Sequence, residues 1–151
     1  MQQPTAHGEL APTDELPTVA RTLDRWRLLR LVIGLQGLYY LVAGLWPLLH
    51  LRSFVWVFGE QRDRFQLDVS AALLIAIGAI LLLAAARRVR PDGLLVSLGA
   101  ASAVALALAE LKHAGAIRPV TWIDFAVELL FAVALAVIYF TARWHERRRS
   151  R

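Results

Sequence analysis

The stretch that decides the fold is VSAALLIAIGAILLLAAA, residues Val69–Ala86, in which 18 consecutive residues carry no charge. A helix of this length rises about 27 Å, close to the roughly 30 Å thickness of the hydrocarbon core of a bilayer. The stretch contains no proline and a single glycine, Gly78, so nothing in it ends a helix early. We therefore predict that it crosses a membrane.

Three further stretches have the same apolar character: Leu28–Leu51, Leu94–Ala109 and Val120–Ala142. The chain of 151 residues is 58% apolar and 19% charged, whereas soluble domains are about 45–50% apolar and about 25% charged. We predict an all-α integral membrane protein with one transmembrane domain over residues 21–142. Its four helices are expected at about residues 28–51, 67–88, 93–112 and 119–143.

The connections between these helices predict how they pack. Two of them, residues 87–93 and 113–119, are short and contain proline and glycine, which favours antiparallel neighbours in an up-down four-helix bundle. The longest connection, residues 52–68, alternates Phe54, Trp56 and Phe58 with valines and then becomes charged. We expect it to lie in the membrane interface or to fold over the mouth of the bundle, as an anchor, a lid or a docking surface.

The basic residues predict the orientation in the membrane. Twelve of the 17 Lys and Arg residues fall in Arg21–Arg30, Arg87–Arg90 and Arg143–Arg151, which would share one side. By the positive-inside rule both termini are cytoplasmic, with residues 1–20 as a disordered tail and residues 143–151 as a basic tail. We expect this basic tail to contact anionic lipid and not nucleic acid. Sixteen of the 17 basic residues are Arg, which points to a GC-rich bacterium and hence to its inner membrane.

Several classes of chemistry lack their residues. The chain has no cysteine, which excludes disulfides, thiolate metal sites and a Cys nucleophile. His50 and His113 could meet at the outer face as metal or haem ligands with Glu110, but no compact ligand motif is present, and interfacial histidines are the preferred interpretation. We predict no metal site and no resident cofactor. A quinone is the one cofactor that remains possible, in the redox alternative described below.

Six polar residues are candidates for a ligand or proton site: Glu128, Asp124, Gln36, Tyr40, Tyr39 and Glu110. Glu128 and Asp124 lie one turn apart on the last predicted helix, and Gln36 and Tyr40 lie one turn apart on the first. Ionisable groups inside a membrane segment are costly and are functional candidates for that reason. In an antiparallel bundle these two faces could meet and form a small polar pocket that opens outward.

This pocket has two interpretations. In the structural one, Glu128 hydrogen-bonds Tyr40 or Gln36 and holds the helices in register. In the functional one, it binds a small ligand, a cation or a proton. We expect a non-enzymatic binding or accessory subunit, with a membrane-protein partner or a second copy of the chain. The alternatives are a proton-coupled small-molecule transporter that uses Glu128, and a quinone- or lipid-linked redox subunit or enzyme.

Helix association in lipid needs close packing, because lipid is as apolar as leucine. Small residues are available for it: Gly34, Gly37 and Gly44 on the first helix, and Gly78 with Ala72, Ala76 and Ala79 on the second. The five tryptophans fit aromatic belts, with Trp46 among those expected at the outer interface.

Two stretches carry a family resemblance: GLYYLVAGLWP at Gly37–Pro47 and PVTWIDFAVE at Pro119–Glu128. Together with Phe54, Gly59 and Asp63 they resemble small bacterial four-helix membrane proteins of unknown function, broadly DoxX-like, over roughly residues 28–139. The resemblance implies a four-helix inner-membrane protein. Some DoxX-type proteins are linked to quinone-dependent sulfur oxidation, but no residue here matches a motif that would carry that activity.

The predicted topology can be tested with a reporter fused into the turn Arg87–Arg90. Because this turn is basic, we expect it in the cytoplasm, where fused green fluorescent protein fluoresces and fused alkaline phosphatase is inactive. Phosphatase activity of a fusion at this turn would contradict the topology.

Overall fold

The protein is described by a computed structural model over residues 16–59, 63–87, 91–113 and 119–149. These ranges form five helices and no strand: α1 (Leu16–Leu49), α2 (Leu51–Phe58), α3 (Arg64–Ala86), α4 (Gly93–His113) and α5 (Pro119–Arg149). Four segments are long and apolar enough to cross a membrane: Arg25–Leu49, Arg64–Ala86, Gly93–Lys112 and Pro119–Arg148. The predictions of an all-α fold and of four helices able to span a membrane are thereby confirmed for the described residues, and they indicate a multi-pass membrane protein.

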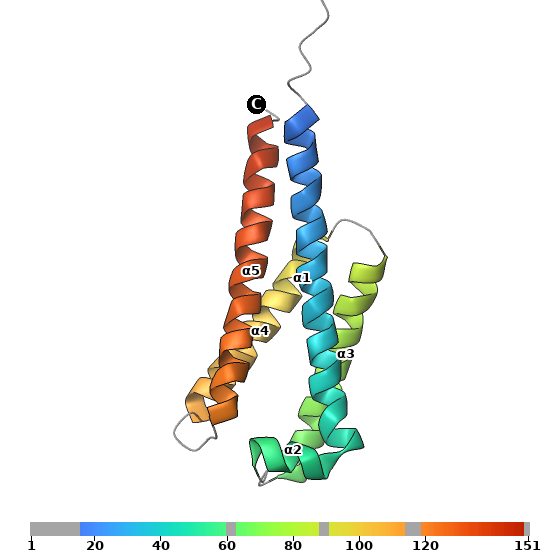
Figure 1. Ribbon diagram of the computed structural model, residues 1–151, viewed down its shortest axis with the longest axis vertical. Helices are drawn as coiled ribbons and strands as arrows, with labels where there is room; N and C mark the ends of the chain where they lie inside the picture. Colours follow the sequence, from blue (N-terminus) through green and yellow to red (C-terminus); the bar gives the residue numbers. More distant parts are fainter. Residues whose placement is uncertain (1–15, 60–62, 88–90, 114–118, 150–151) are drawn as a thin grey trace, which may run out of the picture.

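The long helices are arranged as two pairs. In Figure 1 the chain runs down α1, up α3, down α4 and up α5. Helix α1 packs mainly against α3, and α4 packs mainly against α5. The two pairs meet chiefly along α1 and α5. At the end where α3 stops and α4 starts, α1 and α5 are longer and project beyond the other two helices (Figure 1). The short helix α2 lies at the opposite end, beneath α1 (Figure 1).

Local sequence accounts for the helix ends. Asp63 and Asp92 precede α3 and α4, and each side chain accepts a backbone N–H bond from the first turn, at 2.9 and 2.8 Å. Pro119 opens α5, where a missing N–H costs nothing. Gly59 ends α2 with φ 95°, a backbone conformation that favours glycine.

Two helices are longer than their apolar stretches. Helix α1 begins at Leu16, so residues 16–20, which we assigned to the tail, are helical, whereas residues 1–15 lie outside the described ranges. Helix α5 continues to Arg149, through most of the basic tail. Hydropathy locates the part of a helix that suits lipid and does not detect the turns that continue into the polar phase.

Helices α1 and α3 touch through their backbones. A Cβ atom on Gly78 would lie 2.7 Å from the carbonyl oxygen of Gly37, and one on Gly44 would lie 2.6 Å from that of Ala71. Small residues let backbones approach this closely, as the sequence predicted for Gly37, Gly44 and Gly78. Two of the alanines that were predicted to pack in the same way, Ala72 and Ala76, are exposed and lie outside this contact.

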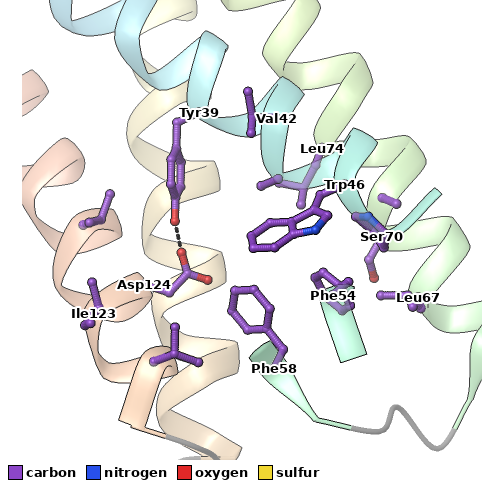
Figure 2. A pocket seen from close by; sticks show the side chains of 15 residues that line it. Tyr39, Val42, Trp46, Phe54, Phe58, Leu67, Ser70, Leu74, Ile123 and Asp124 are labelled. Atoms are coloured by element: carbon purple, nitrogen blue, oxygen red, sulfur yellow. Dashed lines mark hydrogen bonds between the residues drawn. The ribbon is translucent and has the colours of Figure 1, made fainter. Parts of the chain in front are cut away.

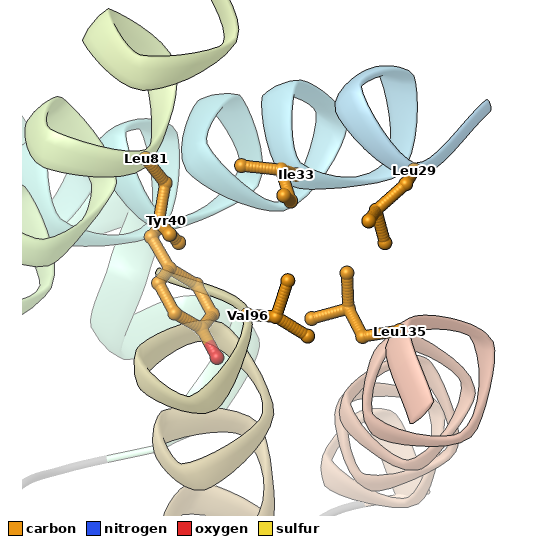
Figure 3. Close-up of a cluster of buried hydrophobic side chains, with 6 residues drawn as sticks. All are labelled: Leu29, Ile33, Tyr40, Leu81, Val96 and Leu135. Carbon is orange, nitrogen blue, oxygen red and sulfur yellow. The ribbon is translucent and has the colours of Figure 1, made fainter. Parts of the chain in front are cut away.

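The apolar core lies where the two pairs meet. Figure 3 shows its six side chains: Leu29, Ile33 and Tyr40 of α1, Leu81 of α3, Val96 of α4 and Leu135 of α5. By contrast, many large apolar side chains are exposed, such as Leu94 at 82% and Phe140 at 69%. Outward-facing apolar side chains of this kind suit a lipid solvent.

The α1–α3 contact predicts that Gly78→Ile destabilises the protein more than Ala76→Ile on the exposed face of the same helix. The added side chain would meet backbone atoms that cannot move aside, and overpacking costs about 1–3 kcal/mol or more. Equilibrium unfolding in mixed micelles with increasing SDS measures both variants. Equal losses of stability would contradict the backbone contact.

Candidate functional site

A chain of hydrogen bonds crosses the core and joins three helices. The hydroxyl of Tyr40 on α1 donates to Glu128 Oε2 on α5 at 2.8 Å. The amide Nε2 of Gln36 donates to Tyr40 Oη at 3.0 Å and to the carbonyl oxygen of Gly99 on α4 at 2.8 Å. All three side chains are buried, with Gln36 and Tyr40 at 0% exposure and Glu128 at 2%. This Gln36–Tyr40–Glu128 set is called the polar chain below.

The sequence explains why the polar chain forms. Gln36 and Tyr40 are four residues apart and therefore share one face of α1. Gly99 leaves room for the amide of Gln36 to reach its carbonyl oxygen. A Cβ atom at this position would lie only 2.8 Å from Gln36 Oε1. A polar group in hydrocarbon finds no water, so it has to find a partner within the protein. The acceptor Gln36 Oε1 has no partner within the described ranges.

A second tyrosine–acid pair lies beside the polar chain. Tyr39 donates a hydrogen bond to Asp124 Oδ1, one turn before Glu128 on α5. Its ring packs against that of Phe131, with centroids 5.9 Å apart. Neighbouring residues on a helix diverge by about 100°, which lets Tyr39 and Tyr40 reach different acids.

A cavity of about 380 Å³ opens next to this pair, between α1, α2, α3 and α5. Figure 2 shows Tyr39 and Asp124 on one side and the rings of Trp46, Phe54 and Phe58 on another. These three rings pack on each other, with Phe54 and Phe58 stacked at 4.8 Å and Trp46 edge-on to Phe58 at 5.9 Å. Apart from Asp124, Tyr39 and Ser70, the cavity wall is almost wholly apolar.

The predicted site residues thus fall into two places. Gln36, Tyr40 and Glu128 form the polar chain and do not line the cavity, whereas Asp124 and Tyr39 do. Tyr40 meets Glu128 of α5 as expected, whereas Gln36 reaches the backbone of α4, which was not expected. Asp124 pairs with Tyr39 and not with Gln36 or Tyr40.

Glu110, the sixth candidate, lies near the end of α4. Its Oε2 atom is buried without a hydrogen-bond partner among the residues described. The end of α4 and the beginning of α5 lie at the same end of the molecule as α2 (Figure 1), so Glu110 lies toward the end that holds the cavity.

Metal ligation finds no support in the described ranges, where no group of three or more His, Asp or Glu side chains could hold an ion. His50 caps α2 instead, and its Nδ1 lies 2.8 Å from the hydroxyl of Ser53. The side chain of His113 lies outside the described part of the chain.

The sequence allowed the segment with Phe54 and Phe58 to fold over the mouth of the bundle, but it did not predict that these two rings and Trp46 line a cavity. Trp46 was assigned to an interfacial belt, yet it lines the cavity, and its indole N–H donates to Ser53 at 2.8 Å. The available signal was the four-residue spacing of Phe54 and Phe58, which puts both on one face of α2. Trp56, on another face, is 79% exposed.

Fold and site together define a small multi-pass membrane protein with an apolar cavity beside a tyrosine–acid pair. No family model, no curated protein and no solved structure matches the chain. The DoxX-like resemblance therefore stays a prediction.

The polar chain predicts that Tyr40→Phe costs more stability while Glu128 is present than when it is absent. Removing the hydroxyl should cost about 0.5–2 kcal/mol in the native chain and clearly less in a Glu128→Leu background, where its acceptor is gone and the bond from Gln36 remains. SDS unfolding of the wild type, Tyr40→Phe, Glu128→Leu and the double variant gives the coupling free energy between the two side chains.

Tyr39→Phe is the matched control, because Tyr39 bonds Asp124 and should lose the same stability in both backgrounds. A Tyr40–Glu128 coupling no larger than that of the control would contradict the hydrogen bond.

Proposed function

We propose that this protein is a membrane-embedded binding protein that holds a mostly apolar molecule in the cavity beside Asp124. The observation that carries the proposal is the cavity itself, about 380 Å³ of space with apolar walls and an acid on one side. Binding sites for small molecules are concave and mostly apolar, with a few polar groups that fix the orientation.

The proposed setting is the inner membrane of a bacterium, with the four spans as a bundle and both termini in the cytoplasm. The distribution of basic residues supports this orientation, since the extended ends of α1 and α5 carry arginines. Near the end of α5, Arg148 lies over the ring of Trp144 at 5.1 Å, an arrangement suited to the interface with anionic lipid. The cavity lies near α2, at the other end, and would face outward.

In this proposal the polar chain and the cavity have different roles. The polar chain fixes α1 against α4 and α5, so that the cavity wall contributed by α1 and α5 keeps its shape. Helix α2 supplies Phe54 and Phe58 to the aromatic part of the wall, beside Trp46 of α1. The arrangement supports a binding or accessory subunit that delivers or senses a hydrophobic molecule.

Filling the cavity tests the proposal. Val127 lines the cavity, whereas Val133 on the same helix is 52% exposed, so Val127→Trp should remove a bound molecule and Val133→Trp should not. Native mass spectrometry of the protein released from mild detergent reports the mass and stoichiometry of what is bound. Wild-type protein without any adduct, or the same adduct on Val127→Trp, would contradict the binding function.

A second candidate, proton-coupled transport, is favoured by the burial of Glu128. A carboxyl group exposed by only 2% within a membrane span, with one tyrosine donor, is a typical proton-carrying site. Glu128→Gln keeps an acceptor for Tyr40 and removes the exchangeable proton. Proteoliposomes with an internal pH dye should then lose proton flux under an imposed pH gradient, and equal flux in wild type and variant would reject this candidate.

A further inference from the structure

We propose that the cavity selects a lipophilic organic cation, with its ammonium group held between the Asp124 carboxylate and the rings of Trp46 and Phe58. This inference rests on the proposed binding function and names the ligand class. It follows from three properties of the cavity: its hydrogen-bonding groups, its aromatic rings and an acid, Asp124, that pairs with no basic side chain among the described residues.

The polar groups of the cavity are left as acceptors. The hydroxyl hydrogen of Tyr39 is used by Asp124, and the indole hydrogen of Trp46 is used by Ser53. In Figure 2 the second carboxylate oxygen of Asp124 points away from Tyr39, toward the space in front of Phe58. A ligand placed there has to offer a donor or a positive charge.

The same property disfavours a quinone. Quinone carbonyls accept hydrogen bonds, and when Asp124 is ionised the side-chain hydroxyl of Ser70 is the donor that remains among the lining residues. Ser70 is exposed and comes from α3, on the other side of the cavity from Asp124 (Figure 2). A quinone head group beside Asp124 would therefore place its carbonyl oxygens, which accept hydrogen bonds, against a carboxylate that also accepts them.

The aromatic rings match a cation. Trp46, Phe54 and Phe58 form one packed group that faces Asp124 across the cavity (Figure 2). Aromatic rings attract ammonium groups through their quadrupoles, and tryptophan does so most strongly. The remaining wall, with Val42, Leu74 and Ile123, suits an alkyl chain or a ring system.

The charge balance points the same way. Within the described ranges no basic side chain forms an ion pair with Asp124 or Glu128, whose bonds come from tyrosines. An ionised Asp124 beside this apolar wall would need a compensating partner, and a cationic ligand would supply it.

The test compares a cation with its neutral isostere. Tritiated decyltrimethylammonium and 2,2-dimethyldodecane, in which carbon replaces the nitrogen, are bound to the full-length protein in nanodiscs. We expect wild type to bind the ammonium at least about tenfold more tightly than the isostere, relative to empty nanodiscs. Asp124→Asn, which keeps an acceptor for Tyr39, should abolish this preference, and Asp68→Asn, whose carboxylate is exposed and does not line the cavity, should not.

The rings are tested separately. Phe58→Leu keeps an apolar wall but removes a ring and should weaken ammonium binding about threefold or more, whereas Phe65→Leu, at a 75% exposed position, should have no effect. This pair keeps the inference testable if Asp124→Asn fails to fold.

The outcomes separate the inference from the function on which it rests. Equal affinity of wild type for the ammonium and the isostere, or unchanged preference in Asp124→Asn, overturns the cation site and leaves an apolar binding protein. Failure of wild type to bind either compound, together with the absence of any co-purified adduct, overturns both.

Discussion

The hydrogen bond from Tyr40 to Glu128 is the interaction on which the rest of the structure depends. In hydrocarbon neither group can turn to water, so each is tied to the other across the boundary between the two helix pairs. Gln36 extends the connection to the backbone of α4 at Gly99, where a larger residue would meet its amide. Three helices are thereby fixed against each other at one level of the membrane.

The remaining contacts follow from this fixed point. On one side, the glycines of α1 let its backbone pack directly against the backbone of α3. On the other side, α5 carries Asp124 one turn from Glu128. At this level the space between the two helix pairs is bordered by Phe54 and Phe58 of the short helix α2. A cavity next to a rigid polar joint is the result, and its acid is positioned by Tyr39.

Much of this was predictable from the sequence. The four apolar stretches predicted the spans because length and hydropathy alone decide what can cross a bilayer. The four-residue spacing of Gln36 and Tyr40, and of Asp124 and Glu128, predicted which faces carry polar groups. The small residues Gly37 and Gly78 predicted close packing, which the structure confirms.

The rest depends on tertiary geometry that no local pattern contains. Whether Tyr39 or Tyr40 meets Asp124 is decided by the crossing of α1 and α5, since both tyrosines project toward that side. Trp46 was assigned to the interface because a tryptophan near the end of an apolar stretch is typical of an interfacial anchor. The local sequence does not distinguish that role from lining a cavity. The first part of the outer connection forms α2, and its last residues belong to α3. That Phe54 and Phe58 line a cavity depends on where α1 and α5 lie around them.

The most direct test is a crystal structure of the protein with decyltrimethylarsonium, in which arsenic marks the position of the cationic centre by anomalous scattering. We predict one arsenic peak within the cavity, between the carboxylate of Asp124 and the rings of Trp46 and Phe58, with the Tyr40–Glu128 hydrogen bond intact beside it. Arsenic only at the surface of the spans, or a cavity closed by its own side chains, would contradict the account.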